Sequence, residues 1–183
     1  MRNLLFPLFC LLFFSCNEGN TPEQQLQADI QKIENYLNDH NLTAESTPSG
    51  LHYIITEPGT GGHPSLSSTV KVNYTGKLLK NEHVFDQTNG TPVSFPLQNL
   101  IEGWQEGIPL LQKGGKGTFF IPSALGYGPY GSGDIPGNAP LIFEIELVSF
   151  WIQFYSNYEN KVPEQRLVAP ALLFVVAIEN QLL

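Results

Sequence analysis

The sequence between residues 93 and 111 joins a short strand pattern to a helix that would be weak on its own. The strand-like run ends at Pro96, and two glycines, Gly103 and Gly107, lie inside the helical stretch that follows. Each interior glycine costs roughly 1 kcal/mol relative to alanine, so this helix needs a sheet to hold it. Its apolar face has helical spacing and is formed by Ile101, Trp104, Ile108 and Leu111.

The sequence on both sides of this helix has the two-residue hydrophobic period of half-buried β-strands. The clearest example is residues 141–148, where large apolar side chains alternate with residues that include two glutamates. Shorter runs of the same kind occur at residues 51–55, 70–75, 83–86 and 117–121. We therefore expect five or six strands. Few helices and short connections favour an α+β fold with an antiparallel sheet.

Residues 1–15 resemble a bacterial lipoprotein signal peptide. Arg2 is followed by an apolar run that is too short to span a membrane, and the run ends at Ser15 and Cys16. The resemblance implies that Cys16 is the lipid attachment site. It also implies a domain in the periplasm or outside the cell, lipid-anchored to a membrane of the bacterial cell envelope. The alternative is an ordinary secretory signal with a chance cysteine. Cys10 lies inside the signal, so the mature chain would have no internal disulfide.

Residues 16–48 are expected to form a polar tether and an N-terminal helix. Thr21 can cap the helix, Pro22 suits its first position and Gln24 can complete a capping box. One apolar stripe follows, formed by Leu26, Ile30, Ile33 and Leu37. The stripe fits packing on the domain that follows. A homodimer paired through this helix is the alternative.

Several classes of function are disfavoured by composition and spacing. A formal net charge of −8 argues against nucleic-acid binding, for which a basic patch is expected. The four histidines show no metal-ligand spacing, and we expect neither a metal nor a cofactor. The run Gly126–Gly131 matches G-x-G-x-x-G, but no strand–helix unit surrounds it, so we reject a nucleotide site. The usual equipment for nucleophilic catalysis is also missing.

What the chain does contain is a set of aromatic residues beside turns and on alternating strands. They lie in five segments whose order and spacing resemble those of the FKBP-type peptidyl-prolyl isomerases. These segments are Val72–Gly76, Val84–Asp86, Leu100–Gly107, Leu125–Gly128 and Leu141–Leu147. The resemblance covers residues 49–150, and it leaves residues 151–183 as a C-terminal tail of unknown role.

The resemblance implies a half-open antiparallel β-sheet wrapped around the short helix, preceded by the N-terminal helix. It implies peptidyl-prolyl cis-trans isomerase activity (EC 5.2.1.8) on X-Pro bonds of exported proteins, through a desolvated aromatic pocket. One alternative is a membrane-anchored chaperone or proline-peptide binding module with little turnover. Another is a purely structural lipoprotein, which would bind nothing in this pocket.

The resemblance also assigns individual residues. Trp104 would form the floor under the proline ring, while the Ile101 N–H and the Tyr127 hydroxyl would hold substrate carbonyls. The full catalytic set would be Tyr74, Phe85, Asp86, Ile101, Trp104, Tyr127 and Phe143. Further substrate-binding positions would be Val93, Phe95, Leu100 and Ile135, with Val93 or Phe95 replacing another family aromatic. Asp134 and Gly137 depart from the family pattern, which leaves substrate preference open.

The N-terminal helix lies outside the region of resemblance. Every residue assigned to the pocket follows Ser49. We therefore expect this helix to be dispensable for the chemistry.

Overall fold

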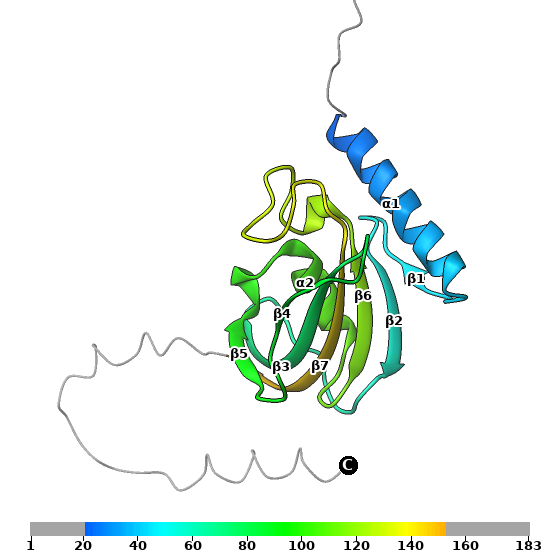
Figure 1. The fold of residues 1–183 in the computed structure, drawn as a ribbon. Coiled ribbons are helices and arrows are strands. Elements are labelled where there is room, and N and C mark those ends of the chain that lie inside the picture. The colour runs from blue at the N-terminus through cyan, green and yellow to red at the C-terminus, as the bar shows by residue number, and fades with distance from the viewer. Residues whose placement is uncertain (1–20, 153–183) are drawn as a thin grey trace, which may run out of the picture. The chain divides into compact units, whose positions relative to one another are not determined.

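The computed structural model describes residues 21–152 (Figure 1). The predicted signal peptide, Cys16 and the tail from residue 153 lie outside the described residues. Within residues 21–152, no helix is long and apolar enough to cross a membrane. The two α-helices are α1 (Pro22–Asp39) and α2 (Glu102–Gly107).

Seven strands form one antiparallel sheet in the order β1-β2-β6-β7-β3-β4, and β5 pairs with β3 beside this path. The strands are β1 (Glu45–Ser46), β2 (His52–Glu57), β3 (Ser68–Leu78), β4 (Val84–Gln87), β5 (Val93–Pro96), β6 (Lys116–Ile121) and β7 (Leu141–Ile152). Three short 3₁₀ helices are η1 (Leu97–Asn99), η2 (Ile108–Leu110) and η3 (Ser123–Leu125). The antiparallel α+β fold predicted from the sequence is confirmed.

The strand count differs from the five or six expected. The additional strand, β1, has two residues, which pair with Tyr53 and His52 of β2. Both β1 residues are exposed, so they give no hydrophobic pattern. The sequence therefore predicts only a tether and a helix for residues 16–48, and no strand there.

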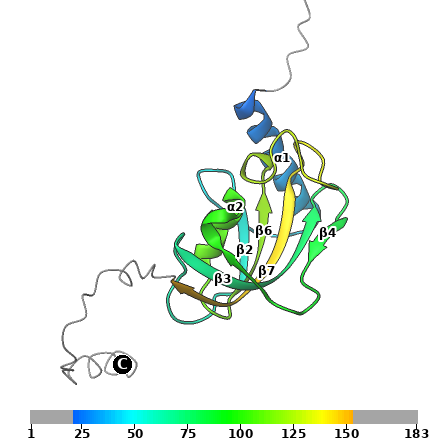
Figure 2. The ribbon, with the colours of Figure 1, turned by 90° about the vertical axis from the view of Figure 1, so that its left-hand side faces the viewer.

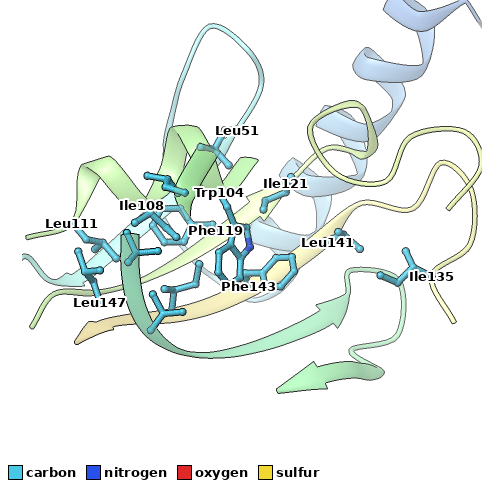
Figure 3. Close-up of a cluster of buried hydrophobic side chains, with 14 of the residues drawn as sticks. Leu51, Trp104, Ile108, Leu111, Phe119, Ile121, Ile135, Leu141, Phe143 and Leu147 are labelled. Carbon is cyan, nitrogen blue, oxygen red and sulfur yellow. The ribbon is translucent and has the colours of Figure 1, made fainter. Parts of the chain in front are cut away.

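The strands β6 and β7 present two different apolar faces. Phe119 and Phe143, which are register partners, belong to the main core beneath α2. Their neighbours Phe120 and Ile142, also register partners, belong to a second core that includes residues of α1. Figure 2 shows α2 in front of the sheet and α1 behind it, and Figure 3 shows the main core. The alternation of β-strand side chains therefore assigns each helix to its own face.

The glycines of α2 allow the helix to approach the sheet closely. A Cβ atom on Gly103 would lie 2.5 Å from Cγ2 of Ile121, and one on Gly107 would lie 2.7 Å from Cδ1 of Phe119. Real Cβ atoms essentially never come so close to a neighbour. The two residues that weaken the helix in isolation are therefore the ones that let Trp104 lie against β6 and β7.

The helix α1 begins as its sequence predicts. The Gln24 N–H donates to Thr21 Oγ1 and the Thr21 N–H donates to Gln24 Oε1, which completes the capping box, with Pro22 in the first turn. Ile33 and Leu37 are buried in the second core. Packing on the domain is thus the role that the structure supports for this stripe, and pairing with a second copy would have to use other residues of the helix.

Candidate functional site

A cavity of about 280 Å³ opens between α2 and the sheet. This volume is close to the lower end of the roughly 300–1,000 Å³ that is typical of small-ligand pockets. Its walls come from β3, β4, β5, η1, α2, β7 and the loop after η3. The lining residues are Tyr74, Phe85, Asp86, Phe95, Asn99, Leu100, Ile101, Trp104, Tyr127 and Phe143.

Trp104 is the centre of the aromatic cluster around this cavity. Its indole lies edge to face with three rings: the centroids of Tyr74 and Phe143 are each 5.1 Å away, and that of Phe95 is 6.3 Å away. The indole is 5% exposed, and Figure 3 shows it beside Phe143. Perpendicular aromatic pairs contribute about 0.5–1.5 kcal/mol each beyond area burial, so the rings fix one another in place.

Phe85 completes the wall, and a glycine makes room for it. Its ring is 5.6 Å from that of Phe143 at an interplanar angle of 81°. A Cβ atom on Gly76 of β3 would lie 2.7 Å from the ring of Phe143 and 2.8 Å from that of Phe85. Because Gly76 has no side chain, the rings of Phe85 and Phe143 can both lie against β3 at this position.

Two tyrosine hydroxyls lie near a carboxylate at the rim. Tyr74 Oη donates to Asp86 Oδ2 at 2.5 Å. Burial, followed by this hydrogen bond and the charge of Asp86, raises the pKa of Tyr74 above its ordinary value. Burial, followed by the Asp86 charge, also raises the pKa of Tyr127. Both phenols therefore stay protonated at neutral pH, so each hydroxyl keeps a proton that it can donate.

We expect the phenol of Tyr127 to ionise above the ordinary tyrosine value of about 10. The difference between the ultraviolet titrations of the wild type and Tyr127→Phe isolates this group among the seven tyrosines. Rapid mixing to high pH records it before unfolding. Asp86→Asn removes the nearby charge and should lower the midpoint. A midpoint below 10, or one that Asp86→Asn leaves unchanged, would contradict this electrostatic description.

Two residues that line the cavity have a donor group without a partner among the described residues. Within residues 21–152, neither the Tyr127 hydroxyl nor the backbone N–H of Ile101 donates a hydrogen bond to another group. The side chain of Gln105 holds the preceding segment, since its Nε2 donates to the carbonyl oxygens of Leu100 at 2.7 Å and Gln98 at 3.3 Å. The segment that carries the Ile101 N–H is thus fixed by α2 before any ligand arrives.

The indole of Trp104 supplies one further donor. Its Nε1 is buried and has no hydrogen-bond partner in the described part of the chain. A buried donor left unsatisfied costs about 1–3 kcal/mol. Such groups are uncommon in native structures and are often found where function requires them.

The structure brings together all seven residues of the predicted catalytic set, along with Phe95 and Leu100. Two predicted substrate-binding residues do not line the cavity. Val93 is 41% exposed on β5, and Ile135 is buried in the main core. Of the two candidates in β5, it is Phe95 that points to the cavity. Sequence reasoning missed Asn99, an exposed residue of η1 that carries no hydrophobic or motif signal.

Two larger hollows lack this convergence of aromatic rings. One of about 570 Å³ lies over polar side chains of β3, β6 and β7, and one of about 830 Å³ lies between α1 and the segments 78–81 and 136–140. No group of three or more His, Cys, Asp or Glu residues between 21 and 152 is arranged to hold a metal ion. We therefore take the aromatic cavity as the candidate site.

Residues 61–148 match the family of FKBP-type peptidyl-prolyl cis-trans isomerases. The isomerase FkpA of Aeromonas hydrophila is 44% identical over 123 residues, which are 65% of this chain and 46% of the relative. The outer membrane protein MIP of Legionella longbeachae is 44% identical over 105 residues, covering 56% of this chain and 45% of that protein. The chain thus spans about half the length of the curated relatives it matches.

A solved structure covers the described fold more completely. The crystal structure of a peptidyl-prolyl cis-trans isomerase from Pseudomonas syringae pv. tomato matches with a TM-score of 0.61 at 30% sequence identity. The match covers 73% of this chain and 98% of that one. Sequence pattern, fold and near-complete coverage of this relative agree, and the chain belongs to the FKBP-type peptidyl-prolyl cis-trans isomerase family.

Proposed function

We propose that this chain is a peptidyl-prolyl cis-trans isomerase whose active site is the aromatic cavity. The observation that carries the proposal is the cluster of five aromatic rings that has Trp104 at its centre, with uncharged donors at its edge. We assign residues 49–150 to the catalytic domain. Residues 1–15 are then the signal peptide, residues 16–48 the tether and helix, and residues 151–183 a tail.

The proposed mechanism needs no acid, base or nucleophile. Rotation about an X-Pro amide passes through a twisted state with a barrier of roughly 18–20 kcal/mol. The twisted amide has lost conjugation, so its carbonyl is less polar than that of the planar form. A pocket that is apolar and poor in water therefore binds the twisted state better than the planar state. Such differential binding accelerates the reaction.

The cavity residues divide this work. Trp104 is the floor under the proline ring, and Tyr74, Phe85 and Phe143 are walls. The Ile101 N–H and the Tyr127 hydroxyl, which have no partner within residues 21–152, hold substrate carbonyls. Asp86 orients Tyr74 through their hydrogen bond and polarises the rim. Asn99 and Leu100 border the entrance from η1 and the residue after it.

The substrates are proline-containing segments of exported polypeptides. Relatives named for the outer membrane and as isomerases support a place in the bacterial cell envelope. Uncatalysed prolyl isomerisation takes about 10–100 s, which is slow enough to limit folding there. Lipid attachment at Cys16 would keep the domain at a membrane surface.

The test is protease-free exchange spectroscopy on short X-Pro peptides with the full chain. We expect faster cis-trans exchange with the wild type and a lower rate with Asp86→Leu at an unchanged melting temperature. Peptide binding without faster exchange would replace the enzyme by a binding module. Absence of both binding and exchange would leave only a structural role.

Cys16→Ser is expected to leave the domain folded and to release it from the membrane fraction, because the substitution removes the thiol that would carry the lipid. Cell fractionation with detection of the protein in pellet and supernatant measures this. Cys10→Ser is the matched control, since it lies in the segment that would be removed. A Cys16→Ser protein that stays in the membrane pellet would refute lipid attachment at this residue.

A further inference from the structure

A charged residue of α1 is buried against the domain. Asp29 is 0% exposed. It lies on the apolar side of the helix, three residues after Leu26 and four before Ile33. Its Oδ1 accepts from Gln25 Nε2 at 2.8 Å and from Lys32 Nζ at 2.9 Å. The carboxylate is therefore stabilised from its own helix, and its second oxygen faces another part of the chain.

That second oxygen binds the start of η3. Asp29 Oδ2 accepts from the backbone N–H of Ser123 at 3.0 Å and from the Ser123 hydroxyl. These two residues are 94 positions apart in sequence. A buried carboxylate that loses its partners costs several kcal/mol, so this pairing strongly favours a single placement of η3 against α1.

The same serine holds the loop that carries Tyr127. The carbonyl oxygen of Ser123 accepts from the N–H of Gly126 at 3.0 Å and from the N–H of Gly128 at 2.8 Å. The two hydrogen bonds hold the residue before Tyr127 and the residue after it. Three consecutive links thus connect α1 to this loop: Asp29 to Ser123, Ser123 to the two glycines, and the glycines to the tyrosine between them.

We infer that Asp29 is a positioning residue of the active site, and that it acts through Ser123 to place the Tyr127 hydroxyl at the cavity. This inference rests on the proposed function, since it gives Tyr127 the role of holding substrate. It also revises the expectation that the N-terminal helix is dispensable for the chemistry, because one residue of the helix fixes a wall of the cavity.

The C-terminal part of α1 makes a second attachment, to the turn before β4. Tyr36 Oη donates to Glu82 Oε1 at 3.1 Å, and burial followed by this bond raises the pKa of Tyr36 to about 12. His40 stacks on Tyr36 with ring centroids 3.9 Å apart, and its Nε2 lies 3.4 Å from Glu82. The strand β4 carries Phe85 and Asp86. The helix α1 therefore contacts the segments that lead to both β4 and the Tyr127 loop, and of these two contacts the one made by Asp29 is buried.

The first test is a double-mutant cycle on kcat/KM in the full chain. Asp29→Asn keeps the size of the side chain but turns one acceptor into a donor, which cannot pair with the donors around it. We expect a loss of roughly five- to tenfold, below the ~100-fold that a 1 Å misplacement can cost. In a Tyr127→Phe background the same change should alter kcat/KM less than twofold, because the hydroxyl it positions is already gone.

The matched control is Ile33→Val, which lies one turn further along α1, is fully buried and belongs to the second core. The change removes a single buried methylene, so the domain should stay folded. We expect its kcat/KM to stay within twofold of the wild type. An equal loss of activity in Ile33→Val and Asp29→Asn, or an undiminished Asp29→Asn effect in the Tyr127→Phe background, would overturn the inference.

The second test does not depend on activity. Amide hydrogen exchange measures protection of the Gly126 and Gly128 N–H groups, which should fall in Asp29→Asn and remain in Ile33→Val. Unchanged protection in Asp29→Asn would overturn the positioning role even if the chain is an active isomerase. Reduced protection in a chain without isomerase activity would leave the structural link standing and reject the proposed function alone.

Discussion

Phe85→Ala is expected to lower kcat/KM for a short X-Pro peptide at least ~10-fold. The ring contacts Phe143 in edge-to-face geometry and fills the space that Gly76 leaves open on β3. Without it, water enters the cavity and the preference for the twisted, less polar amide falls. A tenfold loss requires only about 1.4 kcal/mol of transition-state stabilisation, less than the burial of one phenylalanine commonly provides.

The neighbouring residue supplies the control for this prediction. Val84 precedes Phe85 on β4, is exposed and does not line the cavity. Val84→Ala should therefore keep kcat/KM within twofold. Thermal melts on the same samples separate a lost wall from a lost fold. Full activity of Phe85→Ala would reject the assignment of the aromatic cavity as the active site.

Gly103→Ala is expected to destabilise the domain by about 1–3 kcal/mol, the usual cost of overpacking a core. Helix propensity favours the change by roughly 1 kcal/mol, so a helix free in solution would gain from it. The new Cβ, however, would lie 2.5 Å from Cγ2 and 2.8 Å from Cδ1 of Ile121 in β6. The clash exceeds the gain, and urea unfolding should show a lower midpoint than that of the wild type.

Two further variants test the cause of that loss. Gly62→Ala adds the same methyl group at a position with no atom within 4 Å, and its unfolding midpoint should be nearly unchanged. Ile121→Ala removes the atoms that the new Cβ would meet. The double variant Gly103→Ala/Ile121→Ala should therefore be less destabilised than the sum of the two single changes. A strictly additive result would show that the clash is not the reason.

Much of this architecture could be predicted from local patterns. The capping box at Thr21 and the alternation along β7 depend on neighbouring residues alone, and both are present. The family resemblance stated from five short segments is confirmed by the matched family and fold. Nine of the eleven pocket residues that the resemblance implies lie around one cavity.

What could not be predicted depends on contacts between distant segments. Gly103 is only a weak helix former until Ile121 is seen against it. Aspartate is a residue type usually found at the surface, and the partner of Asp29, Ser123, is 94 positions away. One signal was present in the sequence: a carboxylate at i+3 and i−4 from apolar residues of a stripe interrupts that stripe, and such an interruption indicates a buried partner.

The alternation along β6 has a consequence for how this domain can change over generations. Phe119 packs in the core with Trp104, and the adjacent Phe120 packs in the core with residues of α1. Consecutive residues therefore lie on opposite faces of the sheet. Inserting or deleting one residue in this strand would exchange the two sets of side chains and spoil both cores together. We therefore expect insertions and deletions during evolution to fall in the loops, while β6 changes by substitution only.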